Sequence, residues 1–211
     1  MKWLAFLQLT LLLLLSQHAP AAAALSTLAD LQKGDGEPLI ASAKIIGGVD
    51  ATASEYPWYA ASHGDGKRCG ASLIAPNLLL GAAHCRGSFI SGAHLGETTS
   101  TWNTGTQTVK DGIYVPVKRE IVHPKYNETT YNNDFMLIEL AEKVTNILPV
   151  ELALDPTTSP LGGESLEVIG FGVTQSTSGR AAETLQKLQD MKAVSHAACQ
   201  TLYRRIGWQI Q

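Results

Sequence analysis

The chain has 211 residues, a formal net charge of −3 at pH 7 and an apolar fraction of 45%. The small negative charge and the lack of a basic run give no indication of a nucleic-acid partner. Part of the apolar fraction comes from the first residues, which are not expected to belong to the folded domain.

Residues 1–24 have the organisation of a secretory signal peptide. Lys2 provides a positive start, an apolar run extends from Trp3 to Leu15, and small residues follow up to Ala24. The alternative is a membrane anchor, but this run of 13 residues is shorter than the roughly 20 that a spanning helix needs. We therefore expect cleavage near Ala24, a secreted, extracellular protein and no membrane association.

Residues 25–44 contain glycine and proline and lack a long periodic pattern, which is typical of a flexible surface segment. This segment ends in Lys44, directly before Ile45-Ile46-Gly47-Gly48. A basic residue before an ordinary strand is common, so the junction alone does not indicate a function.

From Tyr56 onward, short apolar runs alternate with turn residues. Residues 69–74 and 78–82 are expected to be strands, with Ala75-Pro76-Asn77 as the turn between them. Many short strands at this spacing predict an all-β sandwich or barrel. The three cysteines, Cys69, Cys85 and Cys199, are an odd number for an exported protein, so one is free, bridges to another chain or lacks its partner.

Four blocks carry a family resemblance. In chain order they are Ile45-Ile46-Gly47-Gly48, the strand 69–74, Gly81-Ala82-Ala83-His84-Cys85, and Asn133-Asp134 followed by the apolar residues 135–138. In this order they resemble the trypsin/chymotrypsin-like serine protease family. The resemblance implies two antiparallel Greek-key β-barrels, the first complete over 45–155 and the second incomplete over 156–211. Residues 166–174 resemble the opening strand of the second barrel, although Asp190 stands where we expect an apolar residue.

The resemblance also implies the chemistry. His84 would act as general base, because imidazole can take the proton of a hydroxyl nucleophile near neutral pH. Asp134 would orient His84 and stabilise its protonated form. Cleavage between Lys44 and Ile45, by a protease with basic specificity, would convert a zymogen into the active form.

In the family the cysteines that match Cys69 and Cys85 form a bridge, which is worth about 3 kcal/mol for a loop of this size. A metal site formed by these cysteines with His84, or by His94 and Glu97, is the alternative. No CxxC pair supports it, so we expect no metal ion and no cofactor. Asn127-Glu128-Thr129 is a sequon for N-glycosylation in an exported protein.

The family's nucleophile motif, Gly-Asp-Ser-Gly-Gly, does not occur in the sequence. Ser165 and Ser195 lie in other settings, and only 77 residues follow Asp134, whereas the template separates its Asp and Ser by about 90. The absence of the nucleophile, its oxyanion hole and the specificity pocket has one simple explanation, a C-terminally truncated chain, which we expect to be inactive as written.

Two functions follow from these observations. The first is a secreted serine endopeptidase, made as a zymogen, that acts on protein or peptide substrates and of which this chain is a fragment. The alternative is a secreted, non-catalytic, protease-like binding module. Retention of both His84 and Asp134 favours the first.

Overall fold

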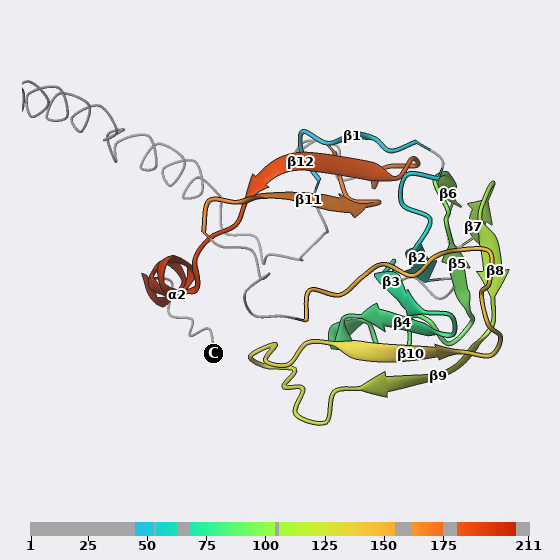
Figure 1. Cartoon of the computed structure of the whole chain (residues 1–211), viewed down its shortest axis with the longest axis horizontal. Coiled ribbons are helices and arrows are strands. Elements are labelled where there is room, and N and C mark those ends of the chain that lie inside the picture. Colours follow the sequence, from blue (N-terminus) through green and yellow to red (C-terminus); the bar gives the residue numbers. More distant parts are fainter. Residues whose placement is uncertain are drawn as a thin grey trace, which may run out of the picture. The chain divides into compact units, whose positions relative to one another are not determined.

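The computed structural model describes residues 45–52, 54–62, 68–103, 106–154, 162–174 and 181–205, without the side chains of 100–103 and 106–109. The expected signal peptide and the segment 25–44, including Lys44, lie outside the described residues. The regular secondary structure of the described part is mostly antiparallel β-strand, with one α-helix and one 3-10 helix (Figure 1), which confirms the expected all-β class. None of its helices has the length and apolar content needed to cross a membrane.

A seven-stranded antiparallel sheet forms the larger part of the fold. Its strands, in spatial order, are β8 (Ile113–Val115), β5 (Ala93–Leu95), β2 (Tyr59–Ser62), β3 (Gly70–Ala75), β4 (Leu78–Gly81), β10 (Met136–Leu140) and β9 (Val117–Val122). The two edge strands, β8 and β9, are separated in the sequence by Pro116 alone. The sheet therefore has to curl until the joined ends of these two strands meet, which gives it the form of a barrel. Proline suits this bend because it has no N–H to donate to a ladder.

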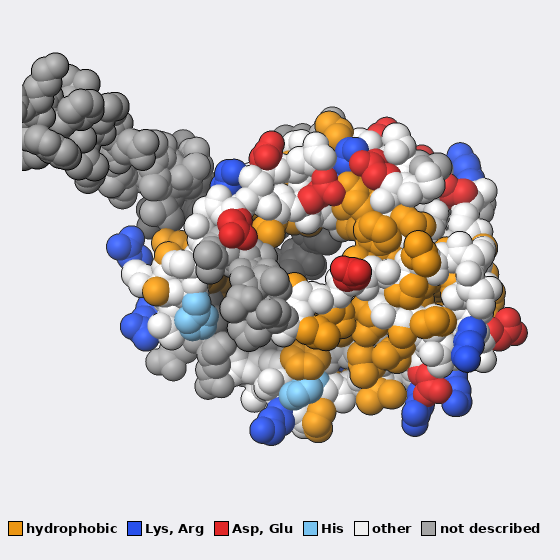
Figure 2. Space-filling view, viewed as in Figure 1, with side chains coloured by type: hydrophobic (Ala, Val, Ile, Leu, Met, Phe, Trp, Pro, Cys, Tyr) orange, Lys and Arg blue, Asp and Glu red, His pale blue; other side chains and the backbone are white. Residues whose placement is uncertain are grey.

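The alternation of side chains along β10 places the core inside this barrel. Met136, Ile138 and Leu140 are buried, while Leu137 and Glu139 on the opposite face are only partly buried. This is the period of two that a strand imposes. Leu79 on the neighbouring strand and Phe89 after it are fully buried in the same cluster. Figure 2 shows further apolar side chains gathered on the face of the molecule over β2, β3 and β4.

A second, three-stranded antiparallel sheet has the order β1 (Val49–Asp50), β12 (Gln186–Lys192) and β11 (Ser165–Gly170). In β1, Val49 pairs with Lys187 and Asp50 pairs with Gln186. The strand nearest the start of the described chain thus lies in the sheet formed by its last part. The boundary expected at residue 155 divides the chain by sequence position, but β1, which precedes it, pairs with a strand that follows it.

Asp190 occupies an irregularity of this second sheet. The register between β11 and β12 shifts between Leu166 and Val168, and Asp190 has a φ of 59°. Such a shift is a β-bulge, and Asp tolerates the left-handed backbone better than an apolar residue does. The bulge accounts for the polar residue at a position where the sequence suggests an apolar one.

The contacts that connect the two sheets include an apolar cluster, a cation–π contact and an ion pair. Ala51, Tyr59, Ala61, Phe171 and Leu185 form a shared apolar cluster. Arg68 lies with its guanidinium carbon 4.5 Å from the centre of the Phe171 ring and donates to the Ala182 carbonyl at 3.1 Å. Lys187 donates to Glu55, and this hydrogen bond holds the pKa of Glu55 at about 2. Together these contacts place the second sheet against β2 of the barrel.

The remaining elements are short. The strands β6 (Ser100–Asn103) and β7 (Thr106–Val109) form a separate two-stranded hairpin. The 3-10 helix η1 (Ala83–Cys85) follows β4, and the α-helix α2 (His196–Arg205) follows β12. The connection between the two sheets leaves Leu148 and Leu154 more than four-fifths exposed.

Candidate active site

His84 is the central residue of η1, a single helical turn directly after β4. Its neighbours Ala83 and Cys85 are buried in the barrel core, so they fix the turn, and the His84 side chain is left 51% exposed at the surface. The two small residues Ala82 and Ala83 let this turn pack closely on the barrel. The local sequence therefore presents one imidazole to solvent on a buried support.

Asp134 reaches His84 because β4 and β10 run antiparallel next to each other. Met136 pairs with Gly81. Asp134, two positions before Met136, and His84, three positions after Gly81, therefore lie beyond the same end of this strand pair. Between Asn133 and Asp134 the chain turns into β10, and Asn133 has a φ of 56°, a backbone that Asn tolerates.

The Asp134 carboxylate binds His84 twice. Its Oδ2 lies 2.7 Å from His84 Nδ1, and its Oδ1 accepts the backbone N–H of His84 at 2.8 Å. One carboxylate therefore fixes both the ring and the backbone of a residue 50 positions away. When Nδ1 carries the ring proton and donates it in this hydrogen bond to the carboxylate, the lone pair of the imidazole is on Nε2, where it can accept a proton. This arrangement is suited to general-base chemistry.

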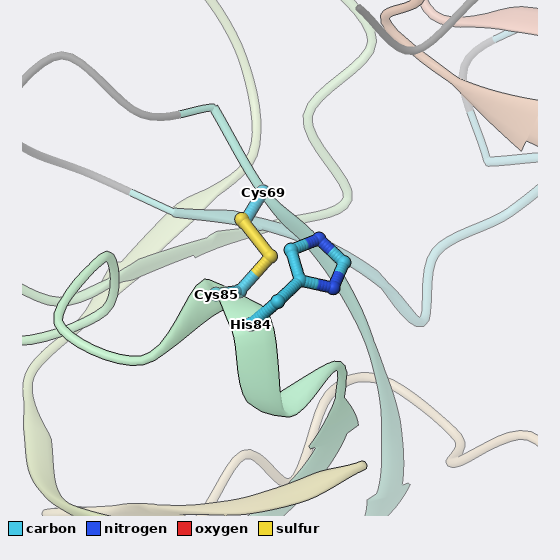
Figure 3. A group of neighbouring side chains, drawn as sticks. All are labelled: Cys69, His84 and Cys85. Atoms are coloured by element: carbon cyan, nitrogen blue, oxygen red, sulfur yellow. A yellow bond between two sulfur atoms is a disulfide. The ribbon is translucent and has the colours of Figure 1, made fainter. Parts of the chain in front are cut away.

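A disulfide supports the histidine turn from the other side. Cys69 and Cys85 are joined, with their Cα atoms 6.1 Å apart, and Figure 3 shows the bridge beside the His84 ring. Cys69, His84 and Cys85 are the only group of potential metal ligands found close together among the described residues. In the disulfide neither sulfur is a thiolate, so these cysteines do not offer the ligands that zinc prefers.

His94 and Glu97, the other suggested pair of ligands, have different surroundings. The His94 ring packs on Tyr114 with centroids 5.3 Å apart. Glu97 is fully buried, and its charge acts on Tyr59. Burial, and after it the charge of Glu97, raises the pKa of Tyr59 above its ordinary value.

The other candidate residues lie apart from the dyad. Ser165 Oγ accepts a hydrogen bond from Lys192 at 2.5 Å in the second sheet. Ser195 Oγ accepts the Ala198 N–H at 3.3 Å at the start of α2. Both serines thus have structural contacts of their own. Cys199, on α2, is a free thiol.

Two residues near His84 were not found from the sequence. The half-exposed Tyr131 ring meets the His84 ring edge-on, with centroids 6.1 Å apart. Glu120 on β9 accepts backbone hydrogen bonds from the turn that follows His84. No local signal marks either one, because each contact depends on how distant segments pack.

Known proteins and one family model match this chain over most of its described residues. A family model described as Trypsin matches residues 45–208. The chain is 31% identical to Trypsin-3 of Salmo salar over 160 residues, which cover 76% of this chain and 64% of the relative. It is 33% identical to Trypsin 5G1 of Aedes aegypti over 176 residues (80% and 62%) and 33% identical to Kallikrein-15 of Homo sapiens over 131 residues (62% and 49%). The chain spans less than two thirds of the length of each of these relatives.

Removing the disulfide tests how much it supports the site. The double substitution Cys69→Ser and Cys85→Ser should lower the free energy of unfolding by about 3 kcal/mol, because the unfolded chain is no longer cross-linked. Urea denaturation followed by tryptophan fluorescence measures this loss. The control is Cys199→Ser, which alters the free thiol and should leave the midpoint almost unchanged. Equal stability of the double variant and the control would contradict the supporting role.

Proposed function

The chain belongs to the trypsin family of serine proteases, and from this we propose that it derives from a secreted endopeptidase made as a zymogen. Family membership supports serine-type cleavage of protein or peptide substrates. The observation that carries the assignment of roles is the 2.7 Å contact between His84 Nδ1 and Asp134 Oδ2 on an exposed edge of the barrel.

In the proposed reaction, His84 Nε2 takes the proton of a serine hydroxyl as that oxygen attacks the substrate carbonyl. Asp134 keeps the ring in the required tautomer and stabilises the imidazolium that forms. His84 then returns the proton to the leaving amine, and the acyl-enzyme is hydrolysed with His84 again as base. The sequence Gly-Asp-Ser-Gly-Gly does not occur in the 211 residues. We therefore propose that this chain by itself is inactive and that neither Ser165 nor Ser195 is its nucleophile.

The surroundings of Ile45 support activation by cleavage after Lys44. The Ile45 side chain is 5% exposed, and its backbone N–H donates to the Val173 carbonyl at 2.9 Å. Gly47, with a φ of 84°, allows the sharp bend that follows. Cleavage would turn the buried amide of Ile45 into an ammonium with three donors, one of which can keep the Val173 carbonyl while the others need further acceptors.

The loop before Asp134 supports N-glycosylation at Asn127. Asn127 is exposed, and its Oδ1 accepts the N–H groups of Thr129 at 2.9 Å and Thr130 at 3.0 Å. The sequon is thus in an accessible turn, and the leader at residues 1–24 provides the route to the secretory compartment where the glycan is added.

The absence of a nucleophile is tested with a serine-directed fluorophosphonate. The secreted chain, cleaved after Lys44, should not be labelled, whereas full-length trypsin treated in parallel should be. In-gel fluorescence measures the labelling. Any stoichiometric labelling of this chain would contradict the proposal, and the substitutions Ser165→Ala and Ser195→Ala would then identify the reactive residue.

Activation is tested by limited digestion with a protease of basic specificity. N-terminal sequencing should find a stable product that begins Ile-Ile-Gly-Gly, because the Lys44–Ile45 bond is cut while the folded barrel resists. Lys44→Gln should abolish this product. Lys33→Gln, in the same segment, is the matched control and should still yield it. A product that begins at Ile45 in the Lys44→Gln variant would argue against this activation bond.

Glycosylation is tested by expression in secreting eukaryotic cells. The chain should lose mass on treatment with an N-glycosidase, and Thr129→Ala should eliminate that shift because the sequon needs its hydroxyl residue. Thr130→Ala, one position further, should retain it. An unmodified Asn127 in the secreted protein, determined by mass spectrometry, would refute the assignment.

A further inference from the structure

The segment that carries His84 is held at three places within residues 84–89. Asp134 binds the backbone N–H of His84, and the disulfide holds Cys85. The third attachment is Glu120, which binds the turn that follows η1. Asp134 has a role in the reaction proposed above and the disulfide supports the turn, whereas Glu120 has been given no role so far.

Glu120 binds this turn with both oxygens of its carboxylate. Oε2 accepts the N–H of Gly87 at 2.6 Å, and Oε1 accepts the N–H of Phe89 at 2.9 Å. Backbone N–H groups bound by a carboxylate form stronger hydrogen bonds than neutral acceptors provide. Glu120 comes from β9, and Gly87 and Phe89 are 33 and 31 residues away in the sequence. The contact is therefore a tertiary one, made across the barrel edge.

The turn needs such a partner because it is neither helix nor strand. Gly87 has a φ of 85°, in the left-handed region, and the side chain of Phe89 is fully buried. An N–H in such a turn has no ladder partner. At the buried Phe89 an unpaired donor would be costly, whereas Gly87 is exposed. Glu120 satisfies two of these donors at once and thereby fixes the direction in which the chain leaves η1.

The position of η1 depends on its two ends. A single 3-10 turn has little stability of its own, because its hydrogen bonds are few and poorly aligned. Its beginning is fixed by Asp134 and its end by the disulfide and Glu120. Because β9 pairs with β10, with Glu120 opposite Ile138, the same strand pair brings both carboxylates to residues 84–89.

We propose that Glu120 is a positioning residue for the His84–Asp134 pair. It acts through the backbone of residues 87–89, and it keeps His84 Nδ1 within hydrogen-bond distance of Asp134. The proposal rests on the function proposed above in so far as His84 is the general base. In catalysis, a displacement of about 1 Å at such a group can cost roughly 10²-fold in rate.

The test is NMR spectroscopy of the chain, which needs no turnover. In Glu120→Ala, the amides of Gly87 and Phe89 should exchange with solvent at least about tenfold faster than in the unaltered chain. The Nδ1–H signal of His84 should broaden or disappear, because the hydrogen bond to Asp134 opens more often. Glu120→Gln has the same size but only one good acceptor and no charge, so it should show the same changes to a smaller degree.

Glu128→Gln is the matched control. Glu128 also binds this turn, but through an ion pair with the Arg86 side chain in which both side chains are more than half exposed. Exposed pairs of this kind contribute little. The control should keep the exchange rates and the His84 signal of the unaltered chain. Amide exchange in β4 and β10 reports whether each variant retains the barrel.

The outcomes separate this proposal from the function it rests on. An unchanged His84 Nδ1–H signal in Glu120→Ala, with β4 and β10 still protected, overturns the positioning role even if the protein is a protease. Loss of the signal supports it even if no peptidase activity is ever found. If Glu120→Ala does not fold, the comparison of Glu120→Gln with Glu128→Gln decides, and equal spectra overturn the proposal.

Discussion

The antiparallel register between β4 and β10 determines where the candidate chemistry of this protein lies. Met136 is opposite Gly81, so the turn that carries His84 and the turn that carries Asp134 lie at the same end of this strand pair. A shift of one residue would move every side chain of β10 to the opposite face. Ile138 and Leu140 would then leave the core, and Asp134 would no longer face η1. The core packing and the site geometry therefore depend on the same pairing.

The pairing of β10 on both of its sides makes that register hard to change. β10 pairs with β4 and with β9, and the chain runs from β8, at one edge of the sheet, through Pro116 to β9, at the other edge. No strand can slide without displacing its neighbours. The buried cluster inside, which includes Leu79 and Phe89, adds a large apolar contribution to this rigidity. Rigid strands with a reactive group on a short turn at their ends are a common way to build a precise site.

The strand pairing brings the His84 turn and its partners near one another, and polar contacts then fix their positions. Two carboxylates, Asp134 and Glu120, bind backbone and side-chain groups of one short segment, and the disulfide at Cys85 lies between them. The His84 side chain remains half exposed. Elsewhere, Arg68 and the apolar cluster around Tyr59 and Phe171 connect the barrel to the second sheet.

The sequence alone was enough to predict the all-β class, the family, and the two residues, His84 and Asp134, whose side chains lie 2.7 Å apart. These could be predicted because strand periodicity and short motifs are local patterns. The pairing of β1 with β12, the bulge at Asp190 and the contacts of Glu120 were decided only by the tertiary structure. Each of them joins residues far apart in the chain. Such contacts form only when strand register, the curl of the sheet and the path of the turns are all set together, and no single stretch of sequence records that combination.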